Sequence, residues 1–268
     1  MTVRTPIHQA IDRVADERDH LEGHLTAIDR FAAGVRELSP VSVAVSSGPP
    51  QRPDGGIVLA DQPQWGADRP SDRCEQVREL FADTIRPYSV DDLAEPEPLL
   101  ETIAEELGTD LALAFSPESK SAFTPQVKRA TLAKARNRRN ECLALQQAIA
   151  READSLDAAV APVETITDWL TRVDETPLLD LGFDDLQTRH ETLADHRERC
   201  RQLLGERQST LQEATSHHAS VGVRQRSAVG YLYCESPTTY PVLSTALRLE
   251  RVCADCQRAV RDHLTRRV

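Results

Sequence analysis

Residues 142–173 read CLALQQAIAREADSLDAAVAPVETITDWLTRV. Ten positions in this stretch follow one another at alternating steps of three and four residues: Cys142, Leu145, Ile149, Glu152, Leu156, Ala159, Val163, Ile166, Leu170 and Val173. Such steps average about 3.5 residues and keep one stripe of a helix against a partner helix. Thr124-Pro125 precedes the stretch and predicts its start, while Pro162 inside it predicts a kink or a short break.

A second long stretch follows a turn of fewer than ten residues and is expected to continue to about Tyr233. Its apolar positions are Leu186, Leu193, Cys200, Leu204, Leu211 and Ala214. Long helices joined by a short turn lie antiparallel. We therefore predict a helical hairpin over residues 124–233 that turns near residue 178, so that facing residues are equally far from the turn. A last helix is expected over 241–266.

The N-terminal residues 1–38 predict another coiled-coil helix. Its seam consists of Ile7, Ile11, Val14, Leu21, Leu25, Ile28, Ala32 and Val35, with Arg18 in the one polar place. Residues 39–70 are rich in proline and glycine and predict either a linker or a minor β-hairpin within 41–60. Short helices are expected over 71–116, with 99–113 as one of them.

Together these patterns predict an all-α fold, an elongated antiparallel coiled-coil-like helical bundle. We divide it into residues 1–38, 39–70 and 71–268. Aromatic residues make up 4% of the chain, so the core is expected to consist of Leu, Val, Ile and Ala side chains.

The charge composition predicts an acidic protein adapted to high salt. The chain has 43 acidic and 32 basic residues and a formal net charge of −11, and Lys120, Lys128 and Lys134 are its only lysines. Molar salt screens charge repulsion within about 3 Å, which lets excess carboxylates be tolerated. A mildly acidic protein from a GC-rich genome is the alternative, because arginine codons are GC-rich.

Several stretches resemble an uncharacterised family of haloarchaeal proteins. They are RCEQVRELFADTI from residue 73, ETIAEELGTDLALAF from 101, TPQVKRATLAKAR from 124, AIAREADSL from 148 and TYPVLSTALRLERV from 239. The resemblance extends with gaps along the whole chain. It implies a halophilic, archaeal source and an α-helical, acidic fold, and it supplies no catalytic residues.

The chain lacks the common enzyme signatures, including phosphate-binding glycine loops and the Gly-x-Ser-x-Gly elbow. We therefore expect a non-enzymatic protein-interaction or scaffold protein without a cofactor, whose partner is another protein or a second copy of this chain. No run of about 18 apolar residues occurs, so no membrane partner is expected. Six scattered cysteines favour reduced thiols in a cytoplasm.

The spacing Cys253-x-x-Cys256 is the one metal-like pattern. His196 and Cys200, one helical turn apart, could complete four zinc ligands. All three cysteines also fall on seam positions, where a free thiol packs as a small apolar group. We favour the packing interpretation and expect no bound metal.

A basic segment offers an anion-binding alternative. Residues 128–139 contain Lys128, Arg129, Lys134, Arg136, Arg138 and Arg139 and no acid. A turn near residue 178 would bring this segment level with Arg224 and Arg226 at the base of the hairpin. The patch could bind nucleic acid, which gives a nucleic-acid-associated or regulatory factor as the alternative function. Docking of the acidic residues 71–112 onto the patch is the favoured interpretation, because molar salt weakens phosphate binding.

The composition predicts that folding depends on salt. Dilution should restore repulsion among the carboxylates and reduce helicity. Far-ultraviolet circular dichroism measured from molar potassium chloride down to about 0.1 M should therefore lose its helical signal. Unchanged helicity across this range would contradict salt adaptation.

Overall fold

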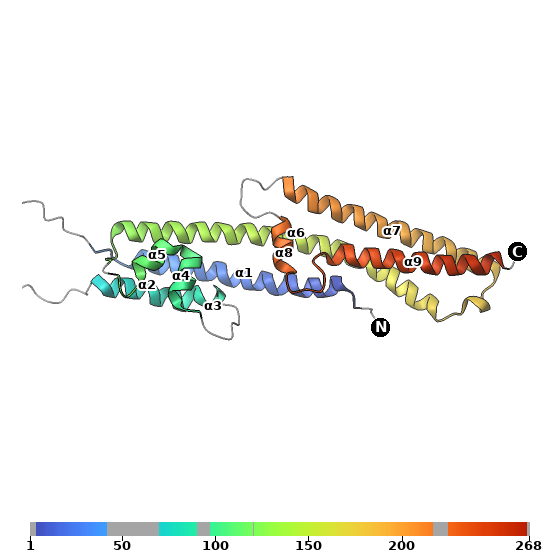
Figure 1. Ribbon diagram of the computed structural model, residues 1–268, viewed down its shortest axis with the longest axis horizontal. Coiled ribbons are helices and arrows are strands. Elements are labelled where there is room, and N and C mark those ends of the chain that lie inside the picture. The colour runs from blue at the N-terminus through green and yellow to red at the C-terminus, as the bar shows by residue number, and fades with distance from the viewer. Residues whose placement is uncertain (1–3, 42–69, 90–96, 120, 217–224, 267–268) are drawn as a thin grey trace, which may run out of the picture. The chain divides into compact units, whose positions relative to one another are not determined.

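The computed structural model describes residues 4–41, 70–89, 97–119, 121–216 and 225–266, and these residues are all-α, as predicted, with no strand among them (Figure 1). The elements are α1 (Pro6–Glu37), α2 (Pro70–Thr84), α3 (Arg86–Ser89), α4 (Leu99–Leu107), α5 (Thr109–Phe115), α6 (Pro125–Asp174), the 3₁₀ turn η1 (Leu178–Asp180), α7 (Phe183–Ser216), α8 (Gln225–Leu232) and α9 (Pro241–Thr265). The predicted linker or β-hairpin at 39–70 falls almost entirely outside the described residues.

The chain divides into two compact units. One contains residues 1–21 and 143–268, and the other contains residues 22–142, so α1 and α6 contribute to both. These boundaries differ from the division into 1–38, 39–70 and 71–268, which stays a prediction.

The unit of residues 22–142 has an aromatic core. Four of the five phenylalanines of the chain are fully buried here: Phe31, Phe81, Phe115 and Phe123. Phe31 of α1 meets Phe81 of α2 edge to face, with ring centroids 5.8 Å apart. Edge-to-face pairs are a favoured aromatic geometry. The expectation of a purely aliphatic core is therefore wrong for this unit, because its few aromatic residues are concentrated in one place.

Residues 99–115 form two short helices rather than one. Gly108 separates α4 from α5 with a φ of 99°, a left-handed backbone conformation that glycine adopts without steric cost. Its N–H donates to the carbonyl of Ala104 at 3.0 Å and ends α4. The predicted single helix is wrong at this point, since apolar periodicity continues across the break.

The other unit contains the turn of the predicted hairpin and the parts of its arms from residue 143 onward. The second part of α6 lies against α7, and α7 packs along α9. Two side-chain contacts fix the pairing of α6 with α7: Glu152 meets Arg207, and Trp169 meets His196. The centre of the turn therefore lies slightly later than residue 178. The helix α6 includes Pro162, so the predicted possibility of a break there is wrong.

The hairpin arm ends earlier than predicted. Helix α7 ends at Ser216, and α8 is a separate helix. Tyr233 and Arg207 both reach Glu152, although a continuous helix would separate these two residues by roughly 39 Å. We placed Arg226 opposite Arg129 by assuming that one continuous helix extends from the turn to about Tyr233. Because α7 and α8 are separate helices, that prediction loses its basis.

Buried positions confirm the predicted seam of α6 and correct that of α1. In α6, seven of the ten predicted seam residues are buried, including Glu152. In α1, the buried residues follow one another at alternating steps of three and four residues, starting at Ile7, and they include Ala10, Glu17, His24 and Phe31. Predicted seam residues Ile11 and Leu25 are only half-buried. Two polar residues thus occupy places that a search for apolar side chains passes over.

Candidate functional site

A buried ion pair joins three segments of the unit of residues 1–21 and 143–268. Arg207 of α7 donates from Nη2 to both carboxylate oxygens of Glu152 in α6, each at 2.8 Å. Its Nη1 donates to Ser155 Oγ at 2.8 Å, and the Tyr233 hydroxyl donates to Glu152 Oε1 at 2.9 Å. The side chains of Arg207 and Glu152 are 1% and 0% exposed. Such burial is tolerated because the two opposite charges pair with each other and further hydrogen bonds reach both side chains.

Burial and the adjacent Glu152 carboxylate raise the pKa of the Tyr233 phenol far above its ordinary value. The hydroxyl therefore keeps its proton and remains a donor to Glu152.

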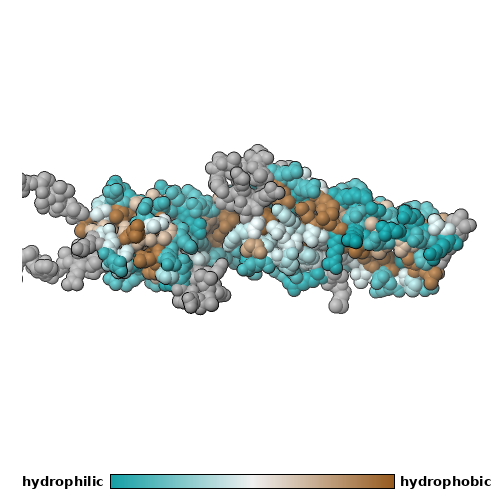
Figure 2. Space-filling model, viewed as in Figure 1, coloured by the Kyte–Doolittle hydropathy of each residue, from teal (hydrophilic) through white to brown (hydrophobic). Residues whose placement is uncertain are grey.

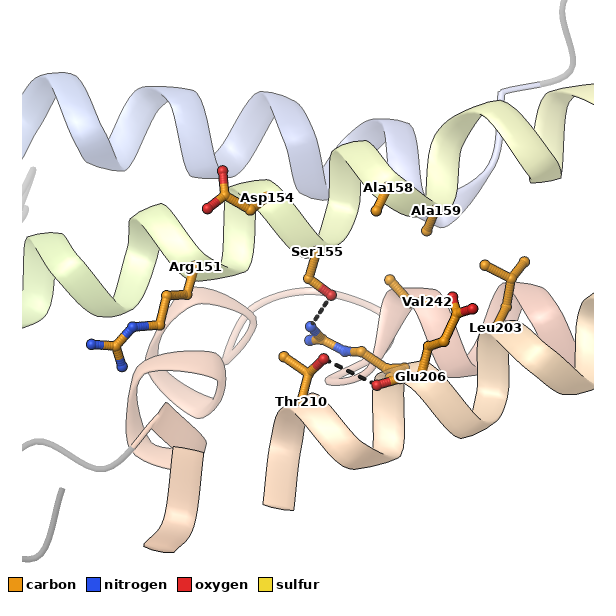
Figure 3. Close-up of a pocket in the computed structure, with 10 residues that line it drawn as sticks. Arg151, Asp154, Ser155, Ala158, Ala159, Leu203, Glu206, Thr210 and Val242 are labelled. Atoms are coloured by element: carbon orange, nitrogen blue, oxygen red, sulfur yellow. Dashed lines mark hydrogen bonds between the residues drawn. The ribbon is translucent and has the colours of Figure 1, made fainter. Parts of the chain in front are cut away.

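A cavity of about 330 Å³ lies beside this ion pair, between α6, α7 and the start of α9. Its lining residues are Arg151, Asp154, Ser155, Ala158, Ala159, Leu203, Glu206, Arg207, Thr210 and Val242. Figure 3 shows the α6 residues facing those of α7 across the cavity, with a dashed line for the hydrogen bond that Ser155 accepts from Arg207. Within the described chain, Nε of Arg207 is buried and has no hydrogen-bond partner. This Nε atom is enclosed by protein and is the one group of the guanidinium without a hydrogen bond in the described chain.

The unit of residues 22–142 contains a second buried polar cluster. Arg138 of α6 donates to Glu106 of α4 through Nε at 2.6 Å and Nη2 at 3.1 Å. His24 of α1 places Nε2 3.5 Å from Glu106 Oε2 and Nδ1 3.9 Å from Cys142 Sγ. His24 and Cys142 are both buried, and the Tyr88 ring lies parallel to the imidazole at 6.3 Å. Side chains from four helices, α1, α3, α4 and α6, thus meet at one histidine.

The electrostatics of this cluster favour charged His24 and Glu106. Burial opposes both charges, but it is outweighed by their neighbours. Bonding to Cys142 and to the Glu106 carboxylate raises the pKa of His24 to about 9. His24 and Arg138 together lower the pKa of Glu106 to about 2. Despite burial, Glu106 also raises the pKa of Arg138 above its ordinary value.

Three side chains of the predicted basic patch have partners inside the unit of residues 22–142. Lys128 donates to the carbonyls of Arg36 and Leu38 at 2.6 and 2.8 Å. These carbonyls lie at the carboxyl end of α1, where the helix itself offers no N–H partner. Arg138 binds Glu106, and Arg139 Nε lies 2.9 Å from Asp29 Oδ1.

The other members of the patch differ in their surroundings. Arg129, Lys134 and Arg136 are exposed on α6. Arg224 lies outside the described residues, and Arg226 falls in α8 without a described side chain. Of the acidic residues 71–112, Glu106 docks on the basic segment. The anion-binding role of the patch stays a prediction.

The four metal candidates lie in the region where α7 packs along α9. Burial raises the pKa of Cys200 to about 11 and, with help from the neighbouring thiols, that of Cys253 to about 12. Burial lowers the pKa of His196, whose ring meets Trp169 edge to face at 4.9 Å. Across the described ranges, no three His, Cys, Asp or Glu side chains form a group that could hold a metal ion. The packing interpretation, with Cys256 half-buried, stays a prediction.

The turn of the hairpin exposes large apolar side chains. Leu179 of η1 is 75% exposed, and Phe183 at the start of α7 is 49% exposed. A hollow of about 200 Å³ lies at the same turn, between the ends of α6 and α9 and the first part of α7, and Leu178 of η1, Leu193 and Val260 are in its wall. Figure 2 shows apolar surface near this turn. Solvent-exposed apolar groups gathered beside a hollow are typical of binding surfaces.

Comparison with protein families gives one match. A family model described as a domain of unknown function, DUF7260, matches residues 5–257. The chain belongs to the DUF7260 family. Membership in an uncharacterised family was predicted from the sequence, whereas a haloarchaeal origin stays a prediction. No curated protein and no solved structure matches the chain.

Within the described part of this DUF7260 chain, no helix has both the length and the apolar character needed to cross a membrane.

His24 should make stability depend on pH. A folded pKa of about 9, against an ordinary value of 6.5, means that its contribution is complete below pH 6.5 and is lost as pH rises through 9. Between pH 6.5 and about 8.5 the loss should be about 2 kcal/mol. Denaturant unfolding at constant salt should show this decline, and His24→Gln should flatten it. His263→Gln on α9 is the control, and equal slopes in both variants would refute the assignment.

The Arg207–Glu152 pair should behave as a coupled unit. Arg207→Met leaves a buried carboxylate without its cation and should lower the free energy of unfolding by about 3–5 kcal/mol. Adding Glu152→Leu removes the stranded charge, so the double variant should regain more than about 1 kcal/mol over the single one. Denaturant unfolding measures both. A double variant no more stable than Arg207→Met would show that the two charges are not coupled.

Proposed function

We propose that this DUF7260 protein is a non-enzymatic protein-interaction or scaffold protein that binds its partner through the turn of the α6–α7 hairpin. The exposure of Leu179 and Phe183 beside an apolar hollow is the observation that carries the proposal. Removing such side chains from water on binding yields about 25 cal/mol for each Å² buried. The partner is another protein or a second copy of the chain.

The seams predicted from the sequence are poor candidates for the binding surface. Seam residues Leu156 and Val163 of α6 and Cys253 of α9 are buried within the chain itself. A partner could reach them only by displacing these helices, whereas the apolar side chains at the turn are accessible in the folded protein.

The alternative is a nucleic-acid-associated or regulatory factor that uses the basic segment. Exposed Arg129, Lys134 and Arg136 favour it. The segment's other charges weaken it, because Lys128, Arg138 and Arg139 bind groups of the chain itself. A sequence-independent phosphate-binding surface gains affinity from each cation it presents, so fewer available cations mean weaker binding.

We also propose that the protein works in a salt-rich archaeal cytoplasm. The acid excess, the scarcity of lysine and the haloarchaeal resemblance support this setting. The same setting favours an apolar interface over an electrostatic one, since molar salt screens exposed charges and leaves apolar burial effective.

Charge introduced at the turn should abolish partner binding. The variant carrying Leu179→Asp and Phe183→Asp places two carboxylates at an apolar interface, where burial without a counter-charge is costly. Leu247→Asp is the matched control, because Leu247 is also exposed in the same unit but lies on α9 away from the hollow. Co-purification from lysate at native salt, with mass spectrometry and light scattering, identifies other proteins and self-association.

Proteins or dimers retained by wild type and Leu247→Asp but lost from the double variant would support the proposal. The same bound set in all three would contradict it. Nucleic acid in the purified complex, lost on reversing Arg129 and Arg136 to Glu, would favour the alternative.

A further inference from the structure

The hairpin turn combines exposed apolar side chains with a surplus of carboxylates. Leu179 is 75% exposed and Phe183 is 49% exposed. Residues 174–185 contain no base, and all five of their acids are exposed: Asp174, Glu175, Asp180, Asp184 and Asp185. The nearest arginines along the chain, Arg172 and Arg189, donate to backbone carbonyls of the chain itself. The turn therefore favours a partner surface that offers apolar area together with positive charge.

The end of α9 does not reverse this charge. Val260 of α9 lines the hollow at the turn. Beyond it the helix end carries Arg261, Asp262 and Arg266, which are two bases and one acid. They add one net positive charge against the five carboxylates of the turn, so this end of the unit stays acidic.

One face of α6 in the unit of residues 22–142 has the matching character. We call it the basic face, and its exposed residues are Arg129, Ala130, Ala133, Lys134 and Arg136. Residues 119–140 contain no acid. Helical spacing places Arg129 and Arg136 on one side of Ala133 and Lys134 on the other. In the described ranges, none of these three cations forms an ion pair. Small apolar side chains thus lie between available cations.

The acidic turn and the basic face complement each other, but they belong to different ends of one helix. Helix α6 is continuous from Pro125 to Asp174, with the basic face near its beginning and the turn after its last residue. Contact between them within one chain would require this helix to break. Contact between two turns would bring like charges together. A second copy of the chain supplies the basic face without either cost.

We propose that the hairpin turn of one copy docks on the basic face of α6 in a second copy. The side chains of Leu179 and Phe183 pack on the alanines of the basic face and on the aliphatic stems of its arginines. The carboxylates of the turn lie next to the three cations. Molar salt screens charges beyond about 3 Å, so only ion pairs in direct contact count, and they fix orientation more than affinity.

This inference rests on the proposed function, because it names the partner of the same turn. The two surfaces differ, so each dimer keeps one turn and one basic face unoccupied. Association therefore continues to larger assemblies or closes in a ring.

Sedimentation velocity of the purified full chain, at a salt concentration that keeps it folded, measures this association. The mass should increase with concentration over about 10–500 µM. The turn variant carries Asp180→Arg with Asp184→Arg, and the face variant carries Arg129→Glu with Arg136→Glu. Either variant alone should raise the dissociation constant at least about tenfold, because like charges then meet. An equimolar mixture of the two should associate again, since each chain offers the charge that the other lacks.

The matched control is Arg13→Glu with Arg18→Glu, which makes the same change of charge at two exposed arginines of α1. It should associate like wild type, and circular dichroism checks that every variant stays helical.

Four results would overturn the inference. One is a wild-type chain that stays monomeric over the whole range; the proposed function would survive this result if turn variants still lost a different protein. A second is unchanged association in the turn variant or the face variant, and a third is an equal loss in the α1 control. The fourth is loss of association after nuclease treatment, which would mean that nucleic acid bridges the copies. Restored association in the mixture supports the head-to-tail contact.

Discussion

The ion pair between Arg207 and Glu152 is the contact on which the unit of residues 1–21 and 143–268 depends. Removing both charges from water costs several kcal/mol for each ion, and a set of hydrogen-bonding partners around the paired charges offsets that cost. Glu152 belongs to α6, Arg207 to α7 and Tyr233 to the segment after α8, so the set closes only when all three segments are in place. Apolar contacts between α6 and α7 tolerate sliding by one turn, whereas this bond network does not. We infer that it fixes the alignment of the hairpin.

The cluster around His24 has a comparable role in the unit of residues 22–142. It joins α1, α4 and α6 through Glu106 and Arg138, next to a core rich in phenylalanine. Both clusters use a guanidinium group that donates to a carboxylate through more than one bond. Arginine suits this task because its planar fork matches a carboxylate and stays charged when buried. An arginine-rich, acidic chain thus uses its surplus charges inside the fold as well as on its surface.

The helices could be predicted from the sequence, but the candidate site could not. Alternating steps located the buried stripe of α6 correctly and included Glu152, because that glutamate interrupts an otherwise regular series. Arg207 is preceded by the apolar pair Leu203 and Leu204. The sequence pattern placed Leu204 on the seam, but Leu203 is the buried one of the two. In α1, Glu17 and His24 are buried. A search for apolar side chains passes over both residues and assigns their positions on the buried stripe to nearby apolar residues. The partner Tyr233 lies beyond the end of α7 at Ser216, and Glu106 lies in the last turn of α4, just before Gly108. Burial of polar residues depends on partners distant in sequence, and one sequence does not reveal them.

Lys128 is one of only three lysines in an arginine-rich chain, and its contacts show what a lysine does there. Its ammonium group donates to two backbone carbonyls, those of Arg36 and Leu38, which converge at the end of α1. A compact, tetrahedral donor can serve two converging acceptors from one atom, whereas a flat guanidinium group spreads its donors over a wider plane. The two converging carbonyls at the end of α1 therefore suit the ammonium group of Lys128 better than a guanidinium group.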